Sequence, residues 1–160
     1  MTTTQITVRG YHEDRFGHVN NARYLELLEE GRWAQFEERG LDTAFFDSHG
    51  IFPVVVRLPI SYRRPASTGE VLEITTDVTS AGRRKIVIAQ QARFTSSGDV
   101  CVEAEVTVMF LEEMTDRPTL LSDEILPVWP ELSAAREWSS MPLAADRGSA
   151  MRSNRSTRRS

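Results

Sequence analysis

One helical segment dominates the first third of the chain and limits the folds open to it. Between Asn20 and Arg39, apolar side chains recur at spacings of three and four residues, at Ala22, Tyr24, Leu25, Leu27, Leu28, Trp33, Ala34 and Phe36. Asn20 or Asn21 can cap the beginning of this helix, and Gly40 can end it. At 1.5 Å per residue the helix is about 30 Å long and crosses a whole small domain. The apolar side chains cover more than half of its circumference in the first turns, which predicts a mostly buried helix.

Most of the remaining sequence up to residue 111 alternates with a period of two, which is typical of strands. We expect a strand at residues 6–9, then a polar loop at 10–18, and after the long helix a short helix at 42–49 that stops at Gly50. A series of antiparallel strands joined by short turns follows, at residues 52–62, 71–79, 85–95 and 100–111. Pro53 and Pro59 interrupt the first strand of this series, so we expect it to be bent or broken.

These elements favour one arrangement. An antiparallel sheet with one apolar face needs a single cover, and a helix that is apolar nearly all round needs to be enclosed. A curved antiparallel sheet wrapped around one long central helix satisfies both needs, so the sequence predicts an α+β chain with the hotdog fold. We expect this domain to span residues 1–130, with one helical turn at 120–126. Residues 131–160 are then a C-terminal extension, expected to be largely disordered from about Ser139 because Ser, Arg and Ala dominate it.

Composition restricts the partners and the compartment. No apolar run approaches the roughly 20 residues of a membrane span, and Met1–Gln5 has neither the basic start nor the apolar stretch of a signal peptide. Cys101 is the single cysteine, so it forms no internal disulfide, and we interpret it as a packing residue in a strand. Residues 147–160 carry five arginines and no acid, so the overall charge of −4 leaves −9 on the other 146 residues. An acidic body argues against a nucleic-acid partner, and the whole pattern predicts a cytoplasmic protein.

The segment before the long helix carries the chemistry. Asp14 lies in a loop that contains Gly10 and Gly17, directly upstream of the helix N-terminus. Unpaired backbone N–H groups and the positive end of the helix dipole at that position suit a developing oxyanion. Thioester hydrolysis needs such a polarised carbonyl and a carboxylate that attacks or deprotonates water. Both groups can lie within a few ångströms of each other in this segment, so its residues are compatible with thioester hydrolysis.

The same segment resembles a known family. Asp14, Gly17, Val19 and Tyr24 match the pattern Asp-x-x-Gly-x-Val-x-x-x-x-Tyr of the 4-hydroxybenzoyl-CoA thioesterase family. The chain is more similar still to the bacterial long-chain acyl-CoA thioesterase III group, over residues 8–12, 18–26, 28–30, 32–33, 54–56 and 60–66. The resemblance covers roughly residues 5–125. Many relatives have a second Asp two positions before the catalytic one, where this chain has His12, as in the long-chain group.

The resemblance implies hydrolysis of medium- to long-chain fatty acyl-CoA by a homodimer or homotetramer with its active site at a subunit interface, without a cofactor. It also implies that Asp14 is the catalytic carboxylate and that a backbone N–H at the start of the helix polarises the thioester carbonyl. A thioesterase acting on acyl carrier protein or on an aryl-CoA is the alternative within the same class. A non-catalytic hotdog module that binds acyl-CoA is the alternative of another class, and it would need a DNA-binding extension for which the tail is too short and featureless.

Further residues are candidates for substrate binding, each with a structural alternative. Those near the loop and the helix start are Gly17, His18, Val19, Asn20 and Tyr24. His18 alternatively holds the loop, Asn20 and Asn21 are helix caps first, and Tyr24 is a core residue with an edge on the pocket. Candidates for the CoA phosphates are Arg63 and Arg64 and the hairpin residues Arg83, Arg84 and Lys85, although basic residues in turns are common surface features.

Two other groups of residues could carry chemistry, but we predict a structural role for each. His12, Asp14 and His18 loosely suggest metal ligands, but the sequence offers no fourth partner, so we predict no metal site. Glu29 and Glu30 lie on the long helix, and we interpret one of them as a buried hydrogen-bonding group or a solvated residue rather than a catalytic acid.

Overall fold

The structure is a computed structural model, and it describes residues 1–135. The first part of the chain contains strand β1 (Thr2–Thr7), a 3₁₀ turn η1 (Gly10–His12), and helices α1 (Asn21–Glu38) and α2 (Thr43–His49). The remaining strands are β2 (Ile51–Arg57), β3 (Ile60–Tyr62), β4 (Val71–Ala81), β5 (Lys85–Phe94) and β6 (Val100–Glu112). Two single helical turns follow, α3 (Leu121–Glu124) and α4 (Leu132–Ala135).

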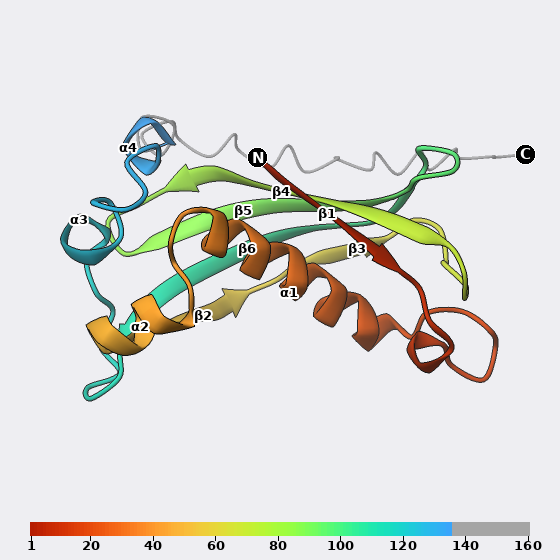
Figure 1. The fold of residues 1–160 in the computed structure, drawn as a ribbon, viewed down its shortest axis with the longest axis horizontal. Coiled ribbons are helices and arrows are strands. Elements are labelled where there is room, and N and C mark those ends of the chain that lie inside the picture. Colours follow the sequence, from red (N-terminus) through yellow and green to blue (C-terminus); the bar gives the residue numbers. More distant parts are fainter. Residues whose placement is uncertain (136–160) are drawn as a thin grey trace, which may run out of the picture.

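The strands form one antiparallel sheet that curves around α1. Its order is β1-β4-β5-β6-β2, and β3 also pairs with β6, so β1 lies at one edge and β2 with β3 at the other. Figure 1 shows α1 crossing one face of this sheet. This architecture confirms the predicted hotdog fold.

The predicted strand 52–62 is broken, as expected, and the break lies at Pro59, whereas Pro53 lies within β2 opposite Phe110. β2 ends at Arg57 with a register shift after Val55, and pairing with β6 resumes only at Ile60, opposite Ala104. Pro59 has no N–H to donate, but its carbonyl accepts a hydrogen bond from Glu105 N at 3.1 Å. The edge therefore continues from β2 into β3 with one interruption.

The first strand was misplaced by the sequence prediction. It spans Thr2–Thr7 rather than residues 6–9, and it pairs in register with β4 from Thr2 opposite Thr76 to Thr7 opposite Val71. Threonine favours strands through its branched side chain but gives no apolar alternation. The hydrophobic pattern consequently missed most of this strand.

The expectation that α1 is enclosed nearly all round is wrong for the single chain. The sheet covers one side of the helix, so Leu25 keeps 39% of its surface exposed, and Glu29 and Glu30 also face outward. The polar residues that are buried on this helix are instead Arg32 and Gln35.

A buried polar network joins α1 to the sheet, and Gln90 on β5 is its centre. The Gln90 side chain accepts a hydrogen bond from Arg32 Nη1 at 2.9 Å and donates to Leu28 O at 2.8 Å and Thr76 Oγ1 at 2.9 Å. Burial lowers the pKa of Arg32, and the nearby Glu29 opposes that shift. The network fixes the height and rotation of α1 on the sheet.

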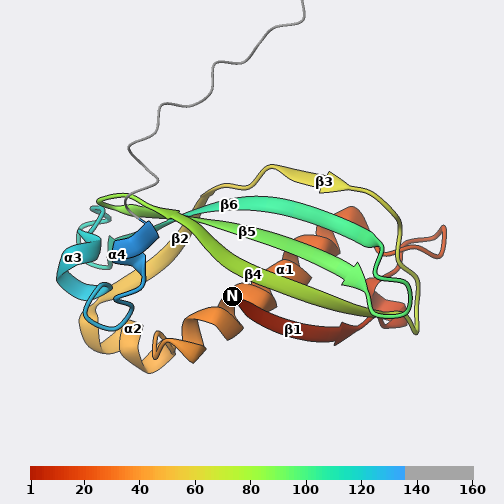
Figure 2. The same cartoon turned by 90° about the horizontal axis from the view of Figure 1, so that it is seen from above.

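Two apolar clusters lie at opposite ends of the helix. One contains Val19, Tyr24, Leu28 and Val102 near the beginning of α1, and the other contains Phe36, Phe46, Phe110 and Leu132 beside α2 and the C-terminal turns. Figure 2 shows the loop before α1 at one end of the molecule and α2, α3 and α4 at the other. Within the described residues, no helix has the length and apolar character needed to span a membrane.

The prediction for the C-terminal region can be compared with the structure only in part. α3 provides the helical turn expected at 120–126, and Leu132, just past the expected domain boundary, is buried with 1% exposure. The expected disorder from Ser139 lies outside the described residues, and the boundary at residue 130 stays a prediction.

Candidate active site

The loop that carries Asp14 is a tight turn closed by the backbone. Asp14 N donates to His18 O at 2.8 Å, and Gly17 N donates to Asp14 O at 3.1 Å. Gly17 has φ +76°, a left-handed conformation that glycine adopts without a steric cost. The Asp14 carboxylate accepts Phe16 N on Oδ1 at 2.8 Å, which fixes one of its oxygens. The other oxygen, Oδ2, has no partner among the described residues.

The beginning of α1 leaves one backbone N–H free. Asn20 caps the helix, with its own N–H donating to His12 O at 2.9 Å and its side-chain oxygen accepting Ala22 N at 2.9 Å. Arg23 N donates to Asn20 O at 2.9 Å. Asn21 N has no acceptor among the described residues. It lies in the first turn, where the helix dipole is positive, and can donate to an oxyanion.

Asp14 and Asn21 line the same cavity, of about 290 Å³. The other lining residues come from the start of α1 and from the segment after β3, and they are Val19, Tyr24, Tyr62, Arg63, Arg64 and Pro65. Tyr62 is half exposed and donates from its hydroxyl to Asn21 O at 3.1 Å. This contact ties the edge of the sheet to the first turn of the helix.

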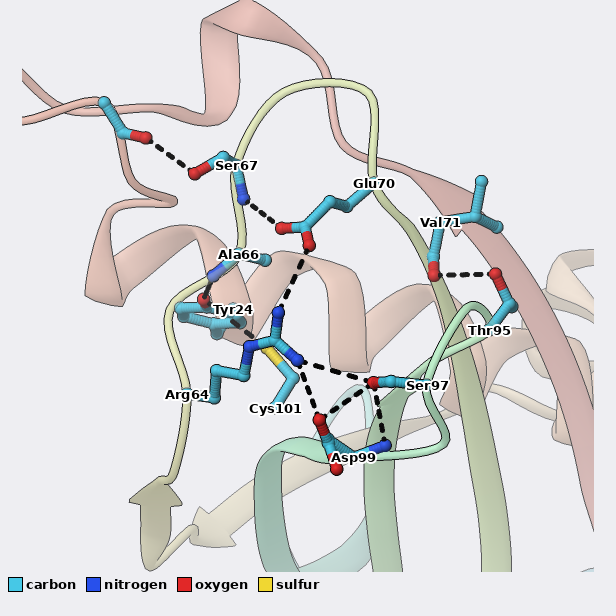
Figure 3. Close-up of polar contacts among 11 residues, drawn as sticks. Tyr24, Arg64, Ala66, Ser67, Glu70, Val71, Thr95, Ser97, Asp99 and Cys101 are labelled. Atoms are coloured by element: carbon cyan, nitrogen blue, oxygen red, sulfur yellow. Dashed lines mark hydrogen bonds and ion pairs between the residues drawn. The ribbon is translucent and has the colours of Figure 1, made fainter.

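The wall of the cavity is held by a buried tyrosine. Tyr24 is 4% exposed, and its hydroxyl accepts Ala66 N at 3.0 Å and the Cys101 thiol at 3.6 Å (Figure 3). Burial raises the pKa of Tyr24 above its usual range, with the Cys101 contact adding to the shift. Tyr24 therefore stays neutral and positions residues 65–66 rather than exchanging protons. It is a core residue with an edge on the pocket, as the sequence indicated.

Hydrogen bonds join the segment after β3 to the Asp14 loop. Val19 N donates to Ala66 O at 2.8 Å, and Ser67 Oγ donates to Gly17 O at 2.9 Å. The Glu13 carboxylate accepts Thr68 N, and this contact lowers the pKa of Glu13. Three contacts thus fix the loop on both sides of Asp14.

Arg63 and Arg64 line the same cavity as Asp14, but each already forms an ion pair with an acidic side chain. Arg63 Nε donates to Glu103 at 3.0 Å, and this arginine lowers the pKa of Glu103. Arg64 Nη1 donates to Asp99 at 2.8 Å and to Ser97 at 3.4 Å, with its guanidinium also 3.9 Å from Glu70 (Figure 3). Both arginines are about half exposed, so their outer N–H groups can meet a phosphate while the acids orient them.

The other basic candidates are far away within the chain. Arg83, Arg84 and Lys85 are exposed in the β4–β5 hairpin, at the end of the sheet that carries α3 (Figure 2). Leu121 N donates to Arg83 O at 3.0 Å. A contact between these side chains and a substrate at Asp14 of the same chain would have to cross the length of the sheet.

The histidines of the loop have separate environments. His12 is 8% exposed, and its Nδ1 accepts Arg9 N at 3.0 Å, so it supports the turn η1. His18 is exposed and holds the loop through its backbone carbonyl. Among residues 1–135, no group of three or more His, Cys, Asp or Glu side chains is arranged to hold a metal ion.

The sequence interpretation missed two residues of this cavity. Tyr62 and Pro65 belong to the resembling segment 60–66, but only its arginines were proposed to bind. The sequence predicted an unpaired backbone N–H at the helix start without naming its residue. Asn20 accepts the N–H of Ala22, which leaves the N–H of Asn21 open.

Comparisons with known proteins show the family of this chain. Residues 8–128 match the model of the thioesterase-like superfamily. The chain is 38% identical over 122 residues to the long-chain acyl-CoA thioesterase FadM of Escherichia coli, which covers 76% of this chain and 92% of FadM. It is 27% identical over 130 residues to the acyl-CoA thioester hydrolase YbgC of Shigella flexneri, covering 79% of this chain and 96% of YbgC. The crystal structure of YbaW, a probable thioesterase from Escherichia coli, superimposes with a TM-score of 0.73 and 35% identity over 82% of this chain and 98% of YbaW. The chain belongs to the thioesterase-like superfamily.

Proposed function

We propose that this protein hydrolyses fatty acyl-CoA thioesters of medium to long chain, with Asp14 as the catalytic carboxylate. One observation carries the proposal: the Asp14 carboxylate and the free N–H of Asn21 line one cavity at the start of a helix. A 38% identical relative that is named a long-chain acyl-CoA thioesterase supports the substrate class.

We propose a task for each group. The Asn21 N–H donates to the thioester carbonyl oxygen and stabilises the negative charge that develops on it. Asp14 then acts as a general base, taking a proton from the water that adds to the carbonyl carbon, or as a nucleophile, adding to that carbon itself. Cleavage of the C–S bond releases the CoA thiolate, which takes up a proton. By the nucleophilic route, water then hydrolyses the acyl-aspartyl anhydride.

Arg63 and Arg64 are the phosphate-binding candidates beside this cavity. Their acidic partners hold the guanidinium groups at its mouth, and arginine forms the paired hydrogen bonds that phosphate oxygens accept. Arg83, Arg84 and Lys85 can take part only from another copy of the chain. We assign no cofactor to the reaction.

A homodimer is the assembly that the fold supports best. The β2 edge carries Val55 and Val56 with 42% and 51% of their surfaces exposed, and an apolar edge strand is a template for pairing with another chain. Pairing of β2 with β2 of a second copy would join two sheets into one. A tetramer built from two such pairs is the alternative. The cytoplasm, where acyl-CoA is available as substrate, stays the expected location.

The decisive experiment is thiol release from a panel of thioesters, followed with DTNB. Palmitoyl-CoA is expected to be the better substrate than benzoyl-CoA or palmitoyl acyl carrier protein. Asp14→Asn should lower kcat at least a hundredfold, a typical loss for a general base, while the melting temperature stays near that of the wild type. Asp77→Asn, an exposed aspartate on β4, is the matched control.

Each alternative has its own outcome. Preference for benzoyl-CoA or for the carrier protein would replace the fatty acyl-CoA substrate by those alternatives. Binding of palmitoyl-CoA without turnover would identify a non-catalytic module, and near-normal activity of Asp14→Asn would remove Asp14 from the mechanism.

A further inference from the structure

A second cavity, of about 420 Å³, lies at the other end of α1 and shares no lining residue with the Asp14 cavity. Its walls are mostly apolar and are provided by Trp33, Phe46, Ile51, Phe52 and Pro53. Thr43, Asp47 and Glu113 complete the lining, so this second cavity contains two acidic residues and no basic one. The lining favours a ligand that combines apolar surface with positive charge.

The two carboxylates of the second cavity have no cationic partner. Asp47 lies on α2, and Glu113 is held beside the end of that helix because its backbone N–H donates to Gly50 O at 2.8 Å. Both side chains are exposed, and within residues 1–135 neither forms a hydrogen bond or an ion pair. Two like charges that line one cavity repel each other, and a cation bound between them would relieve that repulsion.

An arginine side chain has the chemistry that this cavity favours. Its aliphatic stem packs on apolar surface while the guanidinium group stays near water. The guanidinium group also stacks on aromatic rings and donates paired hydrogen bonds to carboxylates. Trp33, Phe46 and Phe52 supply the rings, but no arginine of residues 1–135 lines the cavity.

The described part of the chain ends close to the second cavity. Leu132 of α4 belongs to the same buried cluster as Phe46 and Ile51, which line the cavity. Figure 2 shows α4 and α2 at the same end of the molecule. Twelve residues separate Ala135 from Arg147. A flexible chain of that length spans about 19 Å on average and at most about 40 Å, so residues 147–160 can reach the cavity.

We propose that the arginine-rich segment, residues 147–160, docks in the second cavity of its own chain, with one of its arginine side chains between Asp47 and Glu113. The charges are complementary, since this segment carries +5 and residues 1–146 carry −9. Covalent attachment raises the effective concentration of the segment, so a contact too weak for a free peptide can form within the chain. A composition that predicts disorder in isolation is compatible with ordering on binding. The inference does not depend on the proposed function.

Paramagnetic broadening of NMR signals in the full-length protein tests the docking. Ser153→Cys places a thiol within the segment, and a nitroxide reagent labels it selectively because Cys101 is 1% exposed. The indole N–H of Trp33 and the amide of Glu113 should lose at least half of their intensity relative to the protein with reduced label. The amide of Gly17, at the opposite end of the molecule, should keep its intensity (Figure 2).

Two double variants separate ion pairing in the cavity from general attraction to an acidic protein. Asp47→Asn with Glu113→Gln keeps the shape of the cavity and should restore most of the intensity of Trp33. Asp77→Asn with Glu105→Gln removes two exposed acids from β4 and β6 instead and should leave the broadening unchanged. Replacing the five arginines of the segment by glutamine should abolish the broadening. Salt at about 0.5 M, where charges are screened over about 4 Å, should weaken it.

Three results would overturn the proposal. Full intensity at Trp33 and Glu113 in the labelled protein would show that the segment does not enter the cavity. Equal effects of the two double variants would show that only the overall negative charge attracts the segment. Broadening that disappears on tenfold dilution would identify the occupant as a segment of another molecule. None of these results affects the proposed function, which fails only if the wild type does not hydrolyse acyl-CoA.

Discussion

The hydroxyl of Ser67 donates a 2.9 Å hydrogen bond to the backbone carbonyl of Gly17, across fifty residues of sequence. This contact joins the segment after β3 to the turn that holds Asp14. The helix start is fixed from the same side, because Ala66 binds both Val19 and Tyr24. The loop that carries Asp14, the proposed catalytic residue, is therefore held by contacts that are distant in sequence.

Removing this contact should affect catalysis more than stability. Ser67→Ala leaves the exposed Gly17 carbonyl to water, so the free energy of unfolding should fall by about 1 kcal/mol or less. The looser Asp14 loop should lower kcat about three- to tenfold while KM changes little. Thr79→Val removes a comparable exposed hydroxyl contact, to Val87 O at 3.3 Å, and should not change kcat. An unchanged kcat in Ser67→Ala would show that the backbone contacts alone position Asp14.

Substitution of Gln90 should lower the free energy of unfolding more than substitution of most other polar residues. Gln90→Leu leaves the Arg32 guanidinium, the Leu28 carbonyl and the Thr76 hydroxyl without their partner in a buried environment. We expect a loss of about 2–4 kcal/mol in the free energy of unfolding, measured by urea titration. Gln91→Leu changes the neighbouring residue, which is half-buried and contacts Glu103, and should cost less than about 1 kcal/mol. Similar losses in the two variants would argue against the network.

The Arg63–Glu103 pair should contribute to the acid sensitivity of the fold. Hydrogen bonding and charge from Arg63 lower the pKa of Glu103 below its ordinary value of 4.5. A carboxyl with a depressed folded-state pKa stabilises the protein above its unfolded-state pKa, and that stability is lost as the pH falls through the folded value. Melting temperatures between pH 7 and 3 should therefore fall less steeply below pH 4.5 in Glu103→Gln than in the wild type. Glu105→Gln, two positions along β6, is the control, and identical slopes in the wild type and Glu103→Gln would contradict the assignment.

Cys101 should resist thiol reagents in the folded protein. It is 1% exposed, and burial raises the pKa of its thiol, so little thiolate is present and little of it is accessible. DTNB should label it at least a hundredfold more slowly in the native state than in 6 M guanidinium chloride. Rapid labelling of native protein would show that the region around Tyr24 opens. Slow labelling also means that the enzyme adds no background to a DTNB assay of CoA release.

The sequence predicted the fold where its patterns were long. The 3.6-residue period of α1, the alternation of β4 to β6 and the prolines of the broken edge strand each identify an element without reference to the rest of the chain. The threonines of β1 carry no such pattern, because that strand depends on its pairing with β4. The exposed side of α1 was mistaken for a buried one, since an apolar face looks the same in sequence whether it meets the chain's own sheet or another surface.

The site was predictable only in its local part. Asp14, the capping Asn20 and the start of α1 are close in sequence and follow from loop and cap chemistry. Tyr62 and Pro65 reach the cavity through the pairing of β3 with β6, and the partners of Arg63 and Arg64 come from β6 and the turns near it. Such long-range contacts depend on register, which no local pattern specifies.

The two edges of the sheet differ in a way that limits growth by strand addition. One edge exposes valines, and the other, β1, presents the exposed Thr3 and the half-buried Thr4 and Thr7, whose hydroxyl groups are compatible with water. Pairing of two valine edges would cover the β2 edge of both chains. Only the β1 edges, which carry threonines, would then remain exposed. The proposed homodimer would thus close at a finite size, and an open-ended fibre of stacked sheets would be disfavoured.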